Sequence, residues 1–256
     1  MEGKIFAVTG AGSGIGRATA VRLAELGARG VALSDLFENA LEETKAECSR
    51  YNTDVTITTV DVSDTNQVNS WLDSVITHFG RLDGAANVAG IAGGDGQITE
   101  AIDQAAWEKM IAVNLTGVMN CMRAELQRIN KPGGSIVNVS STSGLRGLAN
   151  NAAYASSKFG VIGLTESTAA EYGKKGVRVN AVLPGPIDTK IFRDGEAKGL
   201  FNADIVSSGT LMGRMGKAEE VAKVLVFLLS DDASFVTGGQ SFPISLTSAR
   251  LLTAFT

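Results

Sequence analysis

Short apolar runs alternate along the chain with longer stretches in which apolar residues recur three and four positions apart. The short runs predict strands at 5–8, 31–35, 55–60, 82–90, 136–139, 177–182 and 241–245. A first helix is predicted to end near Leu26 and a second to start near Asn39. A third buries Val68, Leu72, Val75 and Phe79, and three more cover about 104–129, 154–174 and 219–229. Because strands and helices alternate without a linker or repeat, we expect residues 1–256 to form a single α/β domain with a Rossmann-like, doubly wound parallel sheet.

Composition narrows the class of protein. Of the 256 residues, 44% are hydrophobic and 20% are charged, which predicts a large folded core. The net charge of −4 argues against nucleic acid as a partner, and no apolar run is long enough to cross a membrane. The chain enters its first predicted strand almost at once, so no signal peptide is expected and the protein is predicted to be cytoplasmic.

Cysteine and histidine usage excludes further classes. Cys48 and Cys121 lack metal-ligand spacing and a disulfide-rich context, so free thiols are expected. His78 is the only histidine and lies near the end of a predicted helix, where a surface role is expected. A Ser-His-Asp hydrolase or a histidine-rich metal site is therefore disfavoured, and no bound metal is expected.

A glycine-rich turn separates the first predicted strand from the first predicted helix. Residues 9–16 have the sequence Thr-Gly-Ala-Gly-Ser-Gly-Ile-Gly. Glycines allow a sharp turn and close approach to a pyrophosphate, and the N–H groups of a helix N-terminus bind anions. The pattern favours a dinucleotide site, and a purely structural turn is the alternative. The candidate contacts are Gly10, Ser13, Gly14, Ile15 and Gly16.

Carboxylates follow the second and third predicted strands. Asp35 lies about 20 residues after the glycine turn, where a carboxylate can accept both hydroxyls of an adenosine ribose. It would repel a 2′-phosphate, and no Lys or Arg follows it at 36–37, which favours NAD over NADP. A solvated carboxylate or a helix cap is the alternative. Asp61 is a candidate for the adenine amino group or, equally, for a cap of the next helix.

Two further predicted strands end in segments suited to a ligand. Small residues around Asn87–Gly90 leave room for a flat ligand, with a simple turn as the alternative. Two of the four prolines hold the segment Pro184–Thr189 rigid, and Thr189 could bond a carboxamide or cap a helix. Ligands of doubly wound sheets bind beyond the carboxyl ends of the strands, so all these residues are expected to meet at one crevice.

A proton-transfer group is predicted where the fifth strand joins the next helix. Ser141 follows the strand, and Tyr154 and Lys158 lie four residues apart on one helix face. The ammonium favours the phenolate, so we expect the pKa of Tyr154 to fall from about 10. A fall of about three units requires about 4 kcal/mol and a second positive charge, such as an oxidised nicotinamide ring. Asn114, in mid-helix, indicates either a kink that frees a carbonyl for a bound water or a hydrogen bond to a neighbouring strand.

With these residues placed, nearly the whole chain resembles the short-chain dehydrogenase/reductase family. The matching pieces are Thr9, Gly10, Gly14, Ile15 and Gly16; Asp61 and Val62; residues 87–90; Asn114; Ser141; Tyr154 and Lys158; and Pro184, Gly185 and Thr189. The resemblance implies that Tyr154 is the general acid/base, that Lys158 lowers its pKa and bonds the nicotinamide ribose, that Ser141 holds the substrate oxygen and that Asn114 positions a proton-relay water. It implies cofactor contacts at Gly10, Ser13, Gly14, Ile15, Gly16, Asp35, Asp61, Val62, Asn87, Ala89, Gly90, Tyr154, Lys158, Pro184, Gly185, Ile187 and Thr189.

One departure from the family pattern concerns the C-terminus. The family often has a Val-Asp-Gly-Gly-like sequence after the last strand, whereas residues 242–246 are Phe-Pro-Ile-Ser-Leu. This region meets a neighbouring subunit in many relatives. We expect a homo-tetramer or homo-dimer, since apolar Leu251, Leu252 and Phe255 remain available for packing.

The function expected from these features is NAD-dependent hydride transfer between the cofactor and a secondary alcohol or ketone. Residues 190–212 show weak periodicity and predict a mobile substrate lid, and its apolar residues Ile191, Phe192, Leu200 and Phe201 favour a hydrophobic small-molecule substrate. A ketoacyl-carrier-protein reductase is the nearest alternative, with Arg123, Arg128 and Lys131 as a docking patch. A non-catalytic cofactor-binding sensor or scaffold, and a cofactor that serves epimerisation or cyclisation, are further alternatives.

Overall fold

A parallel sheet of seven strands forms the centre of the computed structural model, which describes residues 1–92, 96–197, 199 and 202–241. The strands are β1 (Ile5–Thr9), β2 (Gly30–Asp35), β3 (Asp54–Thr59), β4 (Gly84–Asn87), β5 (Ser135–Val139), β6 (Arg178–Val182) and β9 (Gln240–Ser241). Their order is β3-β2-β1-β4-β5-β6-β9, so the winding direction reverses between β1 and β4. Such a reversal opens a crevice beyond the carboxyl ends of the two strands. The predicted doubly wound single domain is confirmed.

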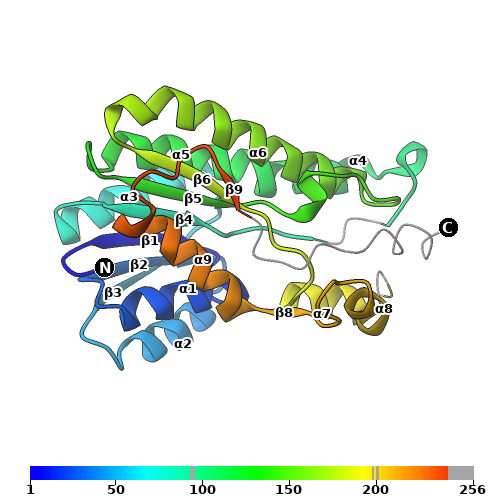
Figure 1. Cartoon of the computed structure of the whole chain (residues 1–256), viewed down its shortest axis with the longest axis horizontal. Helices are drawn as coiled ribbons and strands as arrows, with labels where there is room; N and C mark the ends of the chain where they lie inside the picture. Colours follow the sequence, from blue (N-terminus) through cyan, green and yellow to red (C-terminus); the bar gives the residue numbers. More distant parts are fainter. Residues whose placement is uncertain (93–95, 198, 200–201, 242–256) are drawn as a thin grey trace.

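Helices cover both faces of the sheet (Figure 1). One layer consists of α1 (Gly14–Glu25), α2 (Glu38–Cys48) and α9 (Ala218–Leu229). The other consists of α3 (Thr65–Phe79), α5 (Gly117–Arg128) and α6 (Ala152–Tyr172), with α4 (Gln104–Ile111) leading into α5. No helix in the described part of the chain is long and apolar enough to cross a membrane.

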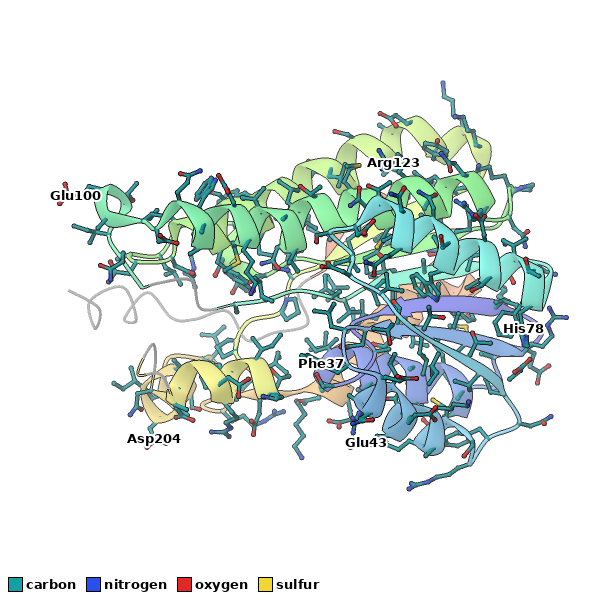
Figure 2. The ribbon with its side chains drawn as sticks, turned by 180° about the vertical axis from the view of Figure 1, so that it is seen from behind. Phe37, Glu43, His78, Glu100, Arg123 and Asp204 are labelled. Atoms are coloured by element: carbon teal, nitrogen blue, oxygen red, sulfur yellow. The ribbon has the colours of Figure 1, made fainter. Side chains whose placement is uncertain are left out.

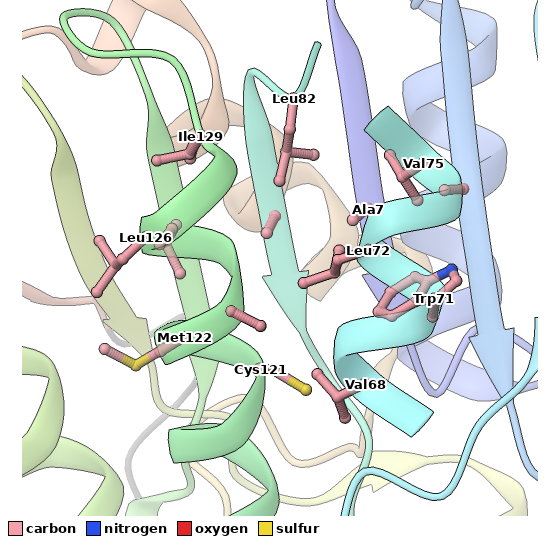
Figure 3. Packing of buried hydrophobic residues seen from close by; sticks show 14 of the residues in the cluster. Ala7, Val68, Trp71, Leu72, Val75, Leu82, Cys121, Met122, Leu126 and Ile129 are labelled. Atoms are coloured by element: carbon pink, nitrogen blue, oxygen red, sulfur yellow. The ribbon is translucent and has the colours of Figure 1, made fainter. Parts of the chain in front are cut away.

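The central strand β1 shows how sequence alternation fills both layers. Its side chains are all buried, and they alternate between the two sides: Ile5 and Ala7 join the cluster beneath α3 and α5, whereas Phe6 and Val8 join the one beneath α1 and α9. Figure 3 shows the first cluster, with Trp71 of α3 in the same layer as α5. Burying each large apolar side chain contributes about 1.5–3 kcal/mol, so this alternation holds β1 between the two helix layers.

Three predicted elements differ from the observed ones. The predicted helix over 104–129 contains a π-helical turn at Ala112–Thr116, centred on Asn114. The predicted strand over 82–90 pairs only at β4. The lid segment contains two short helices, α7 (Lys190–Ala197) and α8 (Ala203–Ser208), between the paired strands β7 (Ile187–Asp188) and β8 (Gly216–Lys217). Of the predicted last strand only Ser241 is described; residues 242–256, with the predicted apolar tail, lie outside the described residues.

Candidate active site

Two reciprocal hydrogen bonds lock the end of β5 to the helix α6. The Lys158 Nζ donates to the Val139 carbonyl at 2.9 Å, and the Ser140 hydroxyl donates to the Lys158 carbonyl at 2.8 Å. All three residues are buried. Because a buried polar group must find a partner, this pairing admits one register of the helix against the strand. The register places the first turns of α6 over the strand end.

The phenol of Tyr154 meets the hydroxyl of Ser141 across this junction. The Ser141 side chain interacts with the phenol and lowers its pKa, and Ser141 Oγ accepts from the Ser143 N–H at 3.1 Å. The turn after β5 thereby holds the Ser141 oxygen beside the Tyr154 phenol. Ser141 and Tyr154 are therefore neighbours, which the four-residue spacing of Tyr154 and Lys158 could not establish by itself.

The expectation that the pKa of Tyr154 is lowered is wrong for the protein without a cofactor. Burial raises the pKa of the phenol above 10, and the hydrogen bond with Ser141 opposes this rise only partly. The Lys158 Nζ lies 5.7 Å from the centre of the Tyr154 ring, and burial lowers the pKa of this amine to about 8. Desolvation of both groups thus outweighs their mutual attraction. A lowered phenol pKa requires the additional positive charge that an oxidised nicotinamide ring brings.

Asn114 is bound to the main chain that follows β4. Its Oδ1 accepts from the Ile91 N–H and its Nδ2 donates to the Ile91 carbonyl, both at 2.8 Å, and Nδ2 lies 3.3 Å from Ser157 Oγ. A π-helical turn is centred on this residue, and its side-chain bonds go to Ile91, which lies beyond the end of β4 and not in a strand as one explanation required. A Cβ added to Gly90 would lie 3.2 Å from Asn114 Oδ1 and 3.6 Å from Lys158 Nζ. Gly90, Asn114 and Lys158 therefore converge at one point.

The glycine turn is packed so closely that side chains are excluded. A Cβ on Gly16 would lie 2.1 Å from the Gly10 carbonyl oxygen, and one on Gly10 would lie 2.8 Å from the Ala89 Cα. The helix α1 starts at Gly14, and Ser13 makes no side-chain capping hydrogen bond there. A narrow loop that ends at a helix N-terminus without its side-chain cap fits the pyrophosphate of a dinucleotide.

Asp35 holds the same turn from the end of β2. Its Oδ2 accepts from the Gly12 N–H at 3.0 Å and its Oδ1 from the Phe37 N–H at 3.2 Å. Each carboxylate oxygen keeps a lone pair for a further donor, as a ribose hydroxyl would be. On the other side, Arg17 Nη2 donates to the Gly12 carbonyl at 2.6 Å and to Glu43 of α2 at 2.7 Å. In Figure 2, Phe37 stands on the side of the sheet toward α7 and α8.

The segment after β6 lies against the glycine turn. A Cβ on Gly14 would lie 3.3 Å from Thr189 Cγ2, so Thr189 borders the start of α1. The Pro184 carbonyl accepts from the Thr142 N–H at 3.0 Å, which ties this segment to the residue that follows Ser141. Gly185 continues the segment, and Ile187 is buried where β7 pairs with β8. The expected convergence of strand ends is present for these residues.

Three of the expected cofactor residues have side chains engaged elsewhere. Asn87 is 1% exposed and donates to Glu125 and Asn138 inside the core. Val62 is buried against Gly117, and Asp61 Oδ1 accepts from the N–H and hydroxyl of Ser63. The alternative that Asp61 caps α3 is wrong, because Asp64 accepts from the first N–H groups of that helix.

Thr9, which the family resemblance included without assigning it a role, is a positioning residue. Its hydroxyl accepts from the N–H groups of Val88 and Ala89, at 3.0 and 3.1 Å. It thereby joins the ends of β1 and β4 where the winding reverses. A hydroxyl at the end of an otherwise apolar, fully buried strand was the available signal.

Comparison with known proteins identifies the family. A family model described as Enoyl-(Acyl carrier protein) reductase matches residues 10–242. "Short-chain dehydrogenase/reductase ABA4" of Pyricularia oryzae is 44% identical over 243 residues, covering 93% of this chain and 89% of that protein. Cyclohexanol dehydrogenase of an Acinetobacter species is 39% identical over 238 residues, covering 93% of this chain and 92% of that one. The chain belongs to the short-chain dehydrogenase/reductase family.

Solved structures of other members share the fold. The crystal structure of levodione reductase has a TM-score of 0.91 at 36% identity and covers 99% of both chains. A xylitol dehydrogenase with bound NAD+ has a TM-score of 0.88 at 31% identity and covers 96% of this chain and 99% of that one. ElxO with bound NADP has a TM-score of 0.85 at 32% identity, covering 94% and 97%. This chain is accordingly a nicotinamide-dependent oxidoreductase of the short-chain dehydrogenase/reductase family.

The predicted basic patch of this short-chain dehydrogenase/reductase is occupied within the chain. Arg128 is paired with Asp73 at 2.8 Å, and the Lys131 amine donates to the Leu126 carbonyl. Arg123 donates to Thr65 and Asn120. Since Arg128 ends α5 just before β5 begins, the patch lies toward the opposite edge of the sheet from the catalytic strand ends. These contacts disfavour a dedicated surface for an acidic carrier protein.

Proposed function

We propose that this chain is an NAD-preferring dehydrogenase/reductase for the secondary alcohol and ketone forms of a hydrophobic, ring-containing small molecule. The observation that carries the proposal is the placement of the Tyr154 phenol beside Ser141, with the Lys158 amine 5.7 Å from its ring centre, at the carboxyl edge of the sheet. The bound nicotinamide supplies or accepts the hydride. Tyr154 gives or takes the hydroxyl proton, and Ser141 holds the substrate oxygen in line with it.

Lys158 and Asn114 complete the proposed arrangement. Lys158 would bond the nicotinamide ribose with the donor capacity that its bond to Val139 leaves. The π-helical turn around Asn114 loosens the regular backbone pairing, and a carbonyl released there would hold the relay water. Because the Asn114 side chain is already bonded to Ile91, it would act by positioning that backbone.

Apolar surface near the catalytic residues supports a hydrophobic substrate. Leu145 and Leu148, in the loop between Ser141 and Tyr154, are 40% and 43% exposed, and Ile191 of α7 is 47% exposed. Side chains of this kind favour an aliphatic ring over a highly charged metabolite. Residues 190–212 would close over the substrate as a lid. Of the predicted lining residues, Leu200 and Phe201 lie outside the described residues.

The test is a screen of NADH oxidation against ketones of graded size. We expect the highest kcat/KM with alicyclic ketones of one or two rings, and low activity with short acyclic or highly anionic ketones. A carrier-bound ketoacyl substrate is the control for the alternative reductase. Absence of NADH or NADPH oxidation with every ketone, in folded protein that binds the cofactor, would favour the sensor alternative instead.

Asp35 tests the NAD preference separately. We expect Asp35→Ala to raise the ratio of kcat/KM with NADPH to kcat/KM with NADH at least about tenfold, which is about 1.4 kcal/mol. The reason is that the substitution removes the charge that repels a 2′-phosphate. Both absolute values should fall, because the variant also releases the Gly12 N–H.

Glu38→Ala is the matched control for Asp35. It removes the same charge from the first turn of α2, close in sequence to Asp35. We expect it to leave the cofactor ratio within about twofold, since exposed charges are screened. An unchanged ratio in the Asp35 variant would show that Asp35 does not contact the ribose.

We also propose a cytoplasmic homo-dimer or homo-tetramer. Phe159 on α6, Phe227 on α9 and Phe235 after it are 45%, 46% and fully exposed, and a partner copy would cover such surfaces. The two free, buried thiols of Cys48 and Cys121 suit a reducing compartment. Sedimentation at equilibrium decides the oligomeric state, and a purely monomeric mass would contradict this part of the proposal.

A further inference from the structure

A carboxyl group lies deep in the layer between α5 and the sheet, away from the catalytic residues. Glu125 of α5 is 1% exposed, and its helix neighbours Cys121 and Met122 belong to the apolar cluster shown in Figure 3. The Glu125 Oε2 accepts a hydrogen bond from Asn87 Nδ2 at 3.1 Å. Among the described residues, Glu125 Oε1 has no hydrogen-bond partner, and neither does Asn87 Oδ1.

The environment of Glu125 suits a neutral acid. Within the described part of the chain no cationic group bonds it, and its one hydrogen-bond donor there is an uncharged amide. An ionised carboxylate without a charged partner is costly to bury, so such a group takes up a proton. In keeping with this, burial raises the pKa of Glu125 from 4.5 to about 8.

A neutral acid accounts for both unpartnered oxygens at once. The acid carries one O–H donor, and the amide of Asn87 carries one carbonyl acceptor. These are the remaining polar atoms of two groups that already share one hydrogen bond. We propose that Glu125 is a positioning residue: as a neutral acid it forms a ring of two parallel hydrogen bonds with Asn87, Nδ2–H to Oε2 and Oε1–H to Oδ1, and so fixes the end of β4 in the active site.

Asn87 links the Glu125 pairing to the active site. Asn87 also donates to Asn138 Oδ1 of β5 at 2.9 Å, and Asn138 donates to Thr165 Oγ1 of α6 at 2.9 Å. The network therefore joins α5, β4, β5 and α6. Asn87 is the last residue of β4, three positions before Gly90, where an added Cβ would lie 3.2 Å from Asn114 Oδ1 and 3.6 Å from Lys158 Nζ. A shift of Asn87 would be passed directly to those residues.

Other titratable groups on the surrounding elements either have partners of their own or lose their proton in a different pH range. On α5, burial and the charge of Glu125 once it has ionised raise the pKa of Cys121 well above its usual value. Arg128 pairs with Asp73 of α3, and Asp83, just before β4, is bonded to Arg81. Lys158 of α6 donates to the Val139 carbonyl.

Two substitutions separate the neutral acid from a carboxylate. Glutamine can form both bonds of the ring and cannot ionise, whereas leucine fills the space and leaves Asn87 without either bond. At pH 7 we expect Glu125→Gln to keep kcat within about twofold. We expect Glu125→Leu to lower kcat at least about fivefold and to raise the KM for the cofactor, because the end of β4 is no longer fixed.

The pH dependence of stability gives a second readout that needs no substrate. A carboxyl with a native pKa of about 8 and an ordinary value of 4.5 binds its proton in the native state while the unfolded chain has lost it. The stability of the unsubstituted chain therefore falls as pH rises from about 4.5 to about 8, and no further above that. Between about pH 4.5 and about pH 8, Glu125→Gln should therefore become more stable relative to the unsubstituted protein. Its unfolding equilibrium constant, divided by that of the unsubstituted protein, should fall by about two to three orders of magnitude.

The first decisive measurement is the free energy of unfolding by denaturant of the unsubstituted protein and of Glu125→Gln, at pH 5, 6.5 and 8. The second is the pH dependence of the carbon NMR signal of the labelled Glu125 carboxyl. A stability difference that does not change between pH 5 and 8, or a carboxyl signal that titrates near 4.5, would overturn the inference. So would a Gln variant as impaired at pH 7 as the Leu variant. The kinetic readout rests on the proposed function, but unfolding and NMR do not, so failure of either proposal can be told from failure of the other.

Discussion

Replacement of Tyr154 by Phe is expected to lower kcat by about 10²–10⁴-fold and to leave the Kd for NADH within a few-fold. The substitution removes one oxygen, which lies beside Ser141 and is the proton donor or acceptor of the proposed reaction. The ring and its packing remain, and so does the Lys158 amine that would contact the nicotinamide ribose. Steady-state rates with the best ketone of the screen and fluorescence titration with NADH measure the two quantities.

The matched control is Tyr172→Phe. Tyr172 ends the same helix α6, and its ring lies 4.1 Å from the Lys175 amine, so this variant also removes a phenol oxygen beside a lysine. We expect its kcat to stay within about twofold, because the C-terminus of α6 is far from the sheet edge that binds the cofactor. A Tyr154→Phe enzyme with near-full kcat would end the assignment of Tyr154 as general acid/base.

Replacement of Gly16 by Ala is expected to weaken NADH binding at least about 100-fold. The added Cβ would lie 2.1 Å from the Gly10 oxygen and 2.6 Å from the Gly10 carbonyl carbon, and both are backbone atoms that no rotamer change can move. The turn must open, so the N–H groups at the start of α1 no longer face a pyrophosphate. Overpacking of this kind also destabilises the fold by about 1–3 kcal/mol. Calorimetric titration with NADH and denaturant unfolding test both effects.

Gly163→Ala is the control for an added methyl group. Gly163 lies inside α6, and its Cβ would meet no atom within 4 Å. Alanine is the better helix former, so we expect this variant to gain about 0.5–1 kcal/mol of stability and to bind NADH unchanged. Normal NADH affinity in a folded Gly16→Ala protein would show that the turn does not hold the cofactor.

Local pattern was sufficient for most elements of the fold. The apolar residues Val68, Leu72, Val75 and Phe79 recur at helical spacing and are buried in the observed α3, although Asp64 rather than Asp61 caps its start. The pattern was not sufficient where a polar side chain inside a helix bonds to a distant part of the chain. Residues 104–129 are helical in composition, but they contain a π-helical turn centred on Asn114, whose side chain is bonded to Ile91 beyond β4.

The sequence by itself determined the order of strands and helices, because alternation and helical spacing record which face of each element is buried. It also determined the chemical groups at the strand ends, including Ser141, Tyr154 and Lys158. It could not determine which polar side chains turn inward. Asn87 ends a strand as Asp35 does, yet its side chain is bonded to Glu125 in the core, while Asp35 bonds the glycine turn at the edge of the sheet.

Only the tertiary structure decided the electrostatics of the site. The pKa of a phenol beside a lysine depends on how much water both groups lose, and this loss is set by layers that are distant in sequence. Packing buried Lys158 and Glu125 enough to move their pKa values to about 8, and raised that of Tyr154. Spacing along a helix specifies which groups are neighbours, but burial by the whole fold decides which of them are charged.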